Sequence, residues 1–215
     1  MNELDNKTTI LPLFANPLMK IQLDLDLEKL SEFAFEIWNK DNNGIQKTNR
    51  GGWHSKNIYE EEHEEFIRLK KEISQYLQTY HLEVFQEEDC KENVIQNLHT
   101  MWVNINEKHH YNEWHIHVYS TLSGVFYIKH GGGNENGAIQ FKNPVGSYMT
   151  CSHWPEGLVE QTKAVVTSEV ISIIPKSNML FIFPSWLEHK VETNLKNDSR
   201  ISLSFNSTPS LEKKS

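Results

Sequence analysis

The second half of the chain is a series of short segments rich in β-branched and aromatic residues. Clusters of turn-forming residues separate these segments, among them HGGGNENG, KNPVG, PKSN and NLKNDS. Short strands with such turn signals are typical of an all-β sandwich or barrel, whereas a parallel sheet would need helices between the strands. The pattern therefore predicts a jelly-roll-like core. The expected strands are residues 94–106, 113–119, 122–129, 138–142, 164–174, 179–183, 187–193 and 200–206.

Two helical patterns lie in the first half of the chain. Apolar residues at helical spacing follow Asp26, which is the expected N-cap, and this helix should run to about Lys40. A second helix is expected from about Glu60 to His81, and its acidic opening lies near the positive end of the helix dipole. The sequence therefore predicts a mainly β protein with N-terminal helices.

The length and composition suit one folded domain. The chain has 215 residues, of which 38% are hydrophobic and 23% charged, so it is too apolar to be disordered and long enough to bury a sizeable core. We expect a single domain over residues 1–215. In it, a helical support over about 10–93 precedes the β core over about 94–207.

Charge and cysteine content argue against several classes of protein. The formal net charge is −8 with no basic run, which gives no reason to expect nucleic acid or an anionic membrane as a partner. Cys90 and Cys151 are distant in sequence, so a disulfide scaffold and a cysteine-ligated metal are not expected. We expect no signal peptide, and no apolar run approaches the roughly 20 residues of a membrane helix. We therefore expect a cytoplasmic protein.

Three histidines are candidate metal ligands. His115 and His117 stand two residues apart in WHIHVY, so on a strand over 113–119 they would point to the same face. A third candidate, His189, lies in LEHKV. An HxH pair alone is more often two hydrogen-bonded or exposed histidines, so the third residue matters. Histidines in polar or turn-like stretches are expected at the surface, namely His63, His109, His110, His130 and His153.

The last predicted strand begins with an arginine. In RISLSFN, Arg200 opens the polar face, opposite the apolar face of the same strand. A guanidinium group binds a carboxylate through two parallel hydrogen bonds, so Arg200 suits a carboxylate clamp. The alternative is a surface ion pair with Asp198 or Glu192.

The order of these motifs resembles a family of 2-oxoglutarate–Fe(II) oxygenases found in bacteria and phages. The similarity runs over roughly residues 10–207 and implies a double-stranded β-helix, the jelly roll of that family. It implies that His115 is the first iron ligand and His189 the distal one. The pieces that carry it are ILPLFANPL, RGGWHS, the HxH pair, LSGVFYI, IFPSWLEHKV and RISLSFN.

The resemblance also implies which residues hold the cosubstrate. Arg200 would bind the far carboxylate of 2-oxoglutarate, and Tyr127 matches a tyrosine that helps to hold the same group. His117 stands where the wider superfamily has an aspartate, so the bare site would carry one more positive charge. Glu113, in register with His115, is a candidate to compensate as a ligand or as a hydrogen-bond partner of one. A solvent-facing glutamate is the alternative.

The implied function is a dioxygenase that uses Fe(II), 2-oxoglutarate and O₂ to hydroxylate a substrate, with release of succinate and CO₂. Two alternatives stay open. A three-histidine zinc hydrolase or hydratase, or a cupin-like dioxygenase, would not need Arg200. A jelly-roll binding module would be non-catalytic. The sequence does not identify the substrate, which is a small molecule or a peptide, or the oligomeric state.

Some residues outside these motifs are candidates for substrate contacts. Trp53 and His54 lie in a glycine-rich segment that either covers the mouth of the site or forms an ordinary packed loop. Trp102 and Asn104 precede the HxH strand and belong either to the pocket or to the core. The insert over 145–167 is long for a connection between core strands, and such loops often carry function, so we expect it to select the substrate.

Overall fold

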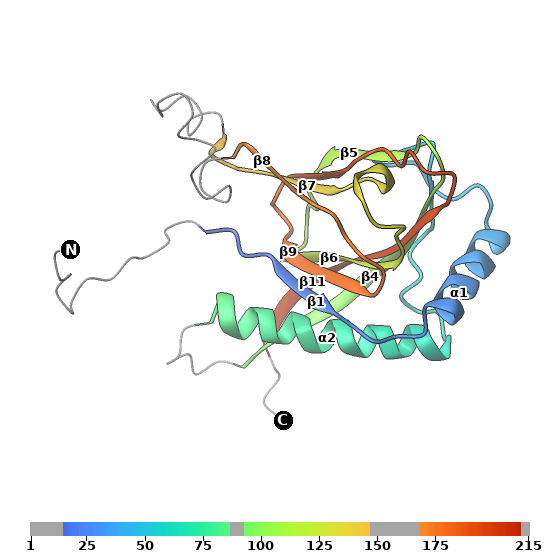
Figure 1. Ribbon diagram of the computed structural model, residues 1–215. Helices are drawn as coiled ribbons and strands as arrows, with labels where there is room; N and C mark the ends of the chain where they lie inside the picture. Colours follow the sequence, from blue (N-terminus) through green and yellow to red (C-terminus); the bar gives the residue numbers. More distant parts are fainter. Residues whose placement is uncertain (1–14, 87–92, 147–167, 212–215) are drawn as a thin grey trace, which may run out of the picture.

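The computed structural model describes residues 15–86, 93–146 and 168–211, and it contains two facing β-sheets and two main helices (Figure 1). The helices are α1 (Leu27–Lys40) and α2 (Glu64–Val84), with a short 3-10 helix at Asn134–Asn136. The strands are β1 (Met19–Gln22), β2 (Asn49–Arg50), β3 (Trp53–His54), β4 (Val94–Asn106), β5 (Tyr111–His115), β6 (Leu122–Lys129), β7 (Ile139–Lys142), β8 (Val170–Ile173), β9 (Met179–Pro184), β10 (His189–Val191) and β11 (Arg200–Leu211).

The two sheets together form a double-stranded β-helix, which confirms the predicted core. The larger sheet has the order β1-β9-β6-β11-β4-β3, and the smaller has the order β2-β5-β10-β7-β8. Neighbouring strands in both sheets are antiparallel. Because the two sheets face each other, side chains that are distant in sequence can meet in the space between the sheets.

Alternation along the strands of the larger sheet divides its side chains between two layers. In β6, Phe126 and Ile128 face the helices and join the main hydrophobic core, whereas Val125 and Tyr127 face the smaller sheet. The α2 helix lies along the outer face of the larger sheet (Figure 1). The inner face of the same strands is therefore free to build a site between the sheets.

The two helices are fixed by side chains that the sequence places at their starts. As predicted, α1 begins after Asp26, whose carboxylate accepts hydrogen bonds from the backbone N–H groups of the first turn. The carboxylate of Glu65 in α2 accepts from the Asp26 backbone N–H at 2.8 Å, so the two helices meet at this point. The second helix begins at Glu64 rather than Glu60 because the preceding residues form a turn, closed by a hydrogen bond from Glu61 N to the Ile58 carbonyl.

The strands differ from the prediction mainly at their ends. Strands β4 and β6 have the predicted bounds, and β11 continues beyond residue 206 to Leu211 along β4. The expected strand over 113–119 ends at His115. Strands β1 to β3 were not predicted, because segments of two to four residues are too short to show a period.

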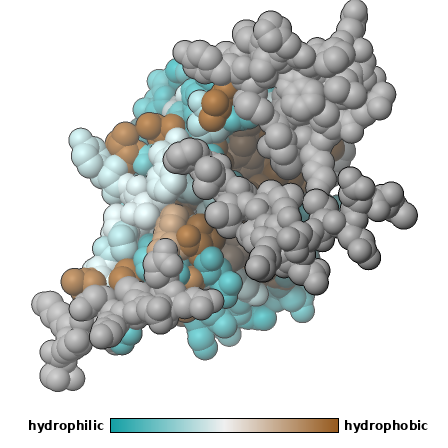
Figure 2. Space-filling view, turned by 90° about the vertical axis from the view of Figure 1, so that its left-hand side faces the viewer, coloured by the Kyte–Doolittle hydropathy of each residue, from teal (hydrophilic) through white to brown (hydrophobic). Residues whose placement is uncertain are grey.

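The surface mixes hydrophobic and hydrophilic residues. On the face shown in Figure 2, brown and teal residues alternate over short distances among the described residues. Single exposed apolar side chains are normal for a folded protein. In the described part of the chain, no helix is long and apolar enough to cross a membrane.

Candidate metal centre

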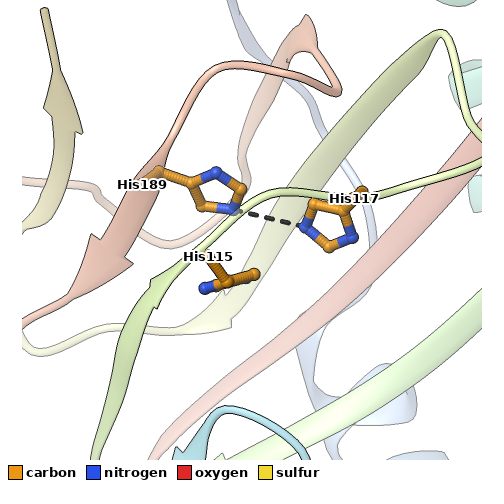
Figure 3. A group of neighbouring side chains, drawn as sticks. All are labelled: His115, His117 and His189. Carbon is orange, nitrogen blue, oxygen red and sulfur yellow. Dashed lines mark hydrogen bonds between the residues drawn. The ribbon is translucent and has the colours of Figure 1, made fainter.

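The three candidate histidines come together between the sheets, at the ends of two paired strands. His115 is the last residue of β5 and His189 the first of β10, and the two residues pair directly across the sheet. His117 lies beyond the end of β5, and its backbone N–H donates to the Ser185 carbonyl at 2.9 Å. The expectation that strand alternation alone would align His115 with His117 is therefore wrong, although the side chains do meet (Figure 3).

The imidazole nitrogens are close enough to share one ion. One ligand nitrogen from each of His115, His117 and His189 lies within 4.8 Å of the others, and His117 Nε2 lies 3.3 Å from His189 Nε2. Among the described residues, these three histidines form the group of potential metal ligands whose donor atoms lie this close together. Imidazole suits iron, zinc, copper and nickel, so the chemistry of the donors alone fits a transition metal.

Backbone carbonyls orient two of the three rings. His115 Nδ1 lies 2.7 Å from the Glu113 carbonyl, and His189 Nδ1 lies 2.8 Å from the Leu187 carbonyl. Because a carbonyl only accepts, Nδ1 carries the proton in both rings and Nε2 keeps its lone pair for an ion.

Aromatic packing holds the third ring. Among the described residues, His117 Nδ1 has no hydrogen-bond partner, and the ring instead packs on Trp102 with centroids 5.6 Å apart. Trp102 in turn stacks on His54, with centroids 5.5 Å apart and ring planes 5° apart. The glycine-rich segment that contains His54 therefore supports the site from β3, and the His54 side chain is buried.

Burial keeps the three rings neutral. Burial lowers the pKa of His117 to about 3. It also lowers the pKa of His115, and it lowers the pKa of His189 well below the ordinary value for histidine. The neighbouring imidazoles add to this effect at His117 and His189. Neutral imidazole is the form that binds metal ions, so at neutral pH the rings are ready to act as ligands.

Arg200 lies in the same cavity as the histidines, with part of its guanidinium group unpartnered. The cavity has a volume of about 280 Å³, and Arg200 and Tyr127 are among the residues that line it. Arg200 Nη1 donates to the carbonyls of Asn136 at 2.7 Å and Glu192 at 3.0 Å. Arg200 Nη2 and the Tyr127 hydroxyl are buried without a hydrogen-bond partner in the described residues. Buried polar groups are rarely left unpaired, so a ligand with acceptor oxygens fits this end of the cavity.

The charge states of this pair suit a carboxylate. Burial lowers the pKa of Arg200 only to about 10 and raises that of Tyr127, so at neutral pH one is a cation and the other a neutral hydroxyl donor. The alternative of a surface ion pair is wrong. Glu192 meets Arg200 through its backbone carbonyl, and the Asp198 carboxylate instead lies 3.8 Å from Lys129 Nζ.

Gly137 allows the close approach of the guanidinium group. Its φ of +83° is rare for residues with a side chain, and a Cβ atom there would clash with Arg200 Nη1 and the Glu192 carbonyl. His130, expected at the surface, is in fact buried beside this turn. Its Nε2 donates to the Gly137 carbonyl at 3.1 Å, and its Nδ1 accepts from Gly132 N at 3.1 Å, so it orders the turn.

Other candidates are separated from the three histidines or lie outside the described residues. The Glu113 carboxylate is exposed and forms an ion pair with Arg50, and it does not join the cluster of ligand atoms. Trp102 and Asn104 line the cavity, as does His54. His153 and nearly all of the insert over 145–167 lie outside the described residues.

A family model matches the part of the chain that contains this site. The model described as "Putative 2OG-Fe(II) oxygenase" matches residues 100–206, about half of the chain. This range includes the three histidines, Tyr127 and Arg200. No curated protein sequence matches the chain.

Solved structures with a similar fold include several enzymes of low sequence identity. HygX from Streptomyces hygroscopicus, with nickel and 2-oxoglutarate bound, has a TM-score of 0.58 and 11% identity over 90% of this chain and 83% of that chain. A Pseudomonas putida prolyl-4-hydroxylase has a TM-score of 0.56 and 14% identity over 90% and 93% of the two chains. The viral collagen prolyl hydroxylase of Paramecium Bursaria Chlorella virus-1 has a TM-score of 0.55 and 14% identity over 89% and 96%. At these identities the likeness is evidence for the fold.

Proposed function

The chain belongs to the 2-oxoglutarate–Fe(II) oxygenases, and we propose that His115, His117 and His189 hold its iron while Arg200 and Tyr127 hold its cosubstrate. As a member of this family it is an oxidoreductase whose cofactors are Fe(II), 2-oxoglutarate and O₂. Its reaction is the hydroxylation of a substrate coupled to the conversion of 2-oxoglutarate to succinate and CO₂. Iron, when bound, supplies the position at which O₂ and the cosubstrate meet.

The observation that carries the assignment of the cosubstrate site is the unpartnered pair at the end of the cavity. Arg200 Nη2 and the Tyr127 hydroxyl are buried donors without partners among the described residues. The far carboxylate of 2-oxoglutarate offers acceptor oxygens to both. Arg200 also supplies a compensating charge, and charge-assisted hydrogen bonds of this kind are roughly twice as strong as neutral ones.

The three neutral imidazoles make iron retention depend on the cosubstrate. Neutral ligands leave the ion's double positive charge uncompensated, whereas an aspartate at position 117 would remove one unit of it. A dianionic 2-oxoglutarate bound at the same ion supplies the missing negative charge. We therefore expect iron and 2-oxoglutarate to bind cooperatively, more strongly than in relatives that have an aspartate at this position.

The decisive experiment measures succinate formed from 2-oxoglutarate under air by the iron-loaded protein. His115→Ala and His189→Ala should abolish it, and Arg200→Ala should raise the 2-oxoglutarate concentration needed for half-maximal rate at least tenfold. Glu113→Gln is the matched control, because its carboxylate pairs with Arg50 and not with the histidines. An iron-loaded protein that binds no 2-oxoglutarate would contradict the proposal and favour the zinc hydrolase or cupin-like alternatives.

We also propose a cytoplasmic location and a small-molecule or peptide substrate, with neither nucleic acid nor membrane as a partner. The net charge of −8 and the absence of a basic run in the sequence support this. Fractionation of cells that produce the protein, with detection in the cytoplasmic fraction, tests the location. Retention on immobilised DNA at physiological salt would count against the expected partners.

A further inference from the structure

We propose that the primary substrate carries an anionic group that pairs with Lys47 at the mouth of the cavity, and a neutral hydrogen-bond donor that meets Asn104. A small carboxylic acid that also bears an amide N–H or a hydroxyl has this chemistry. The inference rests on the proposed function, because it concerns the part of the same cavity that iron and 2-oxoglutarate leave free.

The charges that line the cavity are all positive. Among the described residues that line it, none is an aspartate or a glutamate, and the formal cations are Arg200 and Lys47. Arg200 is taken up by the cosubstrate in the proposed function. Lys47 is exposed, and its ammonium group forms no ion pair or hydrogen bond with the described residues.

Arg200 is buried in the cavity, whereas Lys47 lies exposed at its mouth. Lys47 precedes Thr48, whose carbonyl accepts a hydrogen bond from Glu113 N at 2.9 Å, so it sits beside the strand that ends in His115. A bound 2-oxoglutarate that meets Arg200 therefore leaves Lys47 available.

The missing carboxylate at position 117 strengthens this electrostatic preference. With neutral histidines as ligands, the charge of Fe(II) and that of dianionic 2-oxoglutarate cancel, and the charges of Arg200 and Lys47 remain. An aspartate in place of His117 would lower this net positive charge. A substrate that brings a negative group is therefore attracted to the loaded cavity, and a cationic substrate of the same size is repelled.

Asn104 provides a second and different point of recognition. Its side chain is 7% exposed and lines the cavity, and its Nδ2 donates to Ser204 Oγ at 3.2 Å. Its Oδ1 is buried without a partner among the described residues. A carbonyl oxygen only accepts, so the group that satisfies it must be a donor, and a carboxylate cannot fill this role. Lys47 and Asn104 thus select different groups of one ligand.

The test uses three probes of similar size with the full-length protein loaded with Ni²⁺ and saturating 2-oxoglutarate. The probes are N-acetylglycine, which is an anion, N-acetylglycinamide, which is neutral, and N-acetylethylenediamine, which is a cation. Binding of 2-oxoglutarate is measured first by calorimetry, so a failure of the proposed function is seen before any probe is added. Ligand-observed NMR then gives the affinity of each probe.

N-acetylglycine should bind about threefold to tenfold more tightly than the neutral probe, and the cation should bind most weakly. Lys47→Met should reduce this difference and Lys47→Glu should abolish it, with no loss of 2-oxoglutarate binding. Lys108→Met is the matched control, because Lys108 Nζ bonds to Asn197 Oδ1 and Lys108 does not line the cavity. The proposal is overturned if the anion binds no better than the cation, or if Lys47→Met keeps the full preference.

The donor is tested with acetoxyacetate, the ester analogue that lacks the N–H of N-acetylglycine. The unmodified protein should bind N-acetylglycine severalfold more tightly than acetoxyacetate, and Asn104→Ala should bind both equally. Asn97→Ala is a suitable control, since Asn97 is exposed and bonds to Ser210 and Thr208. Equal binding of the two probes by the unmodified protein would exclude a donor at Asn104.

Discussion

The imidazole of His117 packs against the indole of Trp102, with ring centroids 5.6 Å apart and planes inclined by 34°. The other two histidine rings are oriented instead by a hydrogen bond from Nδ1 to a backbone carbonyl. A ring held by packing alone lacks the directional restraint that a hydrogen bond provides. His117 is therefore the least constrained of the three ligands.

Replacement of Trp102 should weaken the binding of Fe(II) without removing a ligand. We expect Trp102→Leu to weaken Fe(II) binding about tenfold to a hundredfold, because groups that orient metal ligands have effects of this size, and Trp102→Phe to recover much of the loss. Competition with a chelator measures the affinity. Trp186→Leu is the control, since its indole is half-exposed and bonds to Asn16. Unchanged metal affinity in Trp102→Leu would contradict a role in orienting His117.

The ligand set itself separates His117 from Glu113. We expect His117→Ala to weaken Fe(II) binding at least tenfold and Glu113→Gln to leave it unchanged, because Glu113 pairs with Arg50 at the surface. The dissociation constant should be measured with and without 2-oxoglutarate, since the anionic cosubstrate strengthens retention. If Glu113→Gln releases iron as readily as His117→Ala does, the carboxylate is the third ligand.

Tyr127→Phe should lower function while sparing stability. The hydroxyl is buried without a partner among the described residues, so its removal relieves a desolvation cost of about 1–3 kcal/mol, and the 2-oxoglutarate-free protein should unfold at an equal or higher temperature. Affinity for 2-oxoglutarate should fall about fivefold to tenfold. Calorimetry and thermal unfolding of the same samples give both values. A lower unfolding temperature would show that the hydroxyl already has a partner.

Gly137→Ala should displace Arg200 through a single methyl group. The new Cβ would clash with the guanidinium and with the Glu192 carbonyl, and the positive φ of this residue adds backbone strain of about 1 kcal/mol or more. We expect weaker 2-oxoglutarate binding together with lower stability. Gly132→Ala also has a positive φ but meets no neighbouring atom, so it should lower stability without affecting 2-oxoglutarate binding.

The metal-free protein should lose stability as the pH falls. Burial lowers the pKa of His54 to about 4 and that of His117 to about 3, so below the ordinary value of 6.5 the unfolded chain binds protons that the folded protein does not. Each residue should therefore remove roughly 1–2 kcal/mol between pH 7 and pH 5. Urea unfolding at both pH values measures this, and His54→Gln should reduce the difference. A pH-independent free energy of unfolding would show that these rings are solvated.

The sequence was sufficient for the β core and for the HxH pair, because both depend on repeated local patterns, and the resemblance to the oxygenase family added His189 to these histidines. It was not sufficient for how they meet. His117 reaches the site from an irregular segment beyond β5, and its position depends on a backbone hydrogen bond to Ser185 on a distant part of the chain. The burial of His130 was also unpredictable, because polar glycine-rich sequence normally indicates a surface turn, and here the turn folds over the guanidinium group.

The position of His54 beside the site could not be predicted from the sequence either. Its strand has only two residues, which is too short to show a period, yet pairing of His54 with Asn104 places the ring beside Trp102. Contacts of this kind depend on the pairing of strands far apart in the sequence. A single sequence contains no signal for them.

The position of β11 has a consequence for how the protein folds during its synthesis on the ribosome. It is the last of the described strands to be synthesised, yet it lies inside the larger sheet between β4 and β6. Until it emerges, both neighbours present unpaired edges, which are sites of aggregation. Arg200 is the first residue of this strand. A nascent chain therefore acquires its anion clamp and closes its larger sheet in the same late event, and a chain stalled before residue 200 has neither.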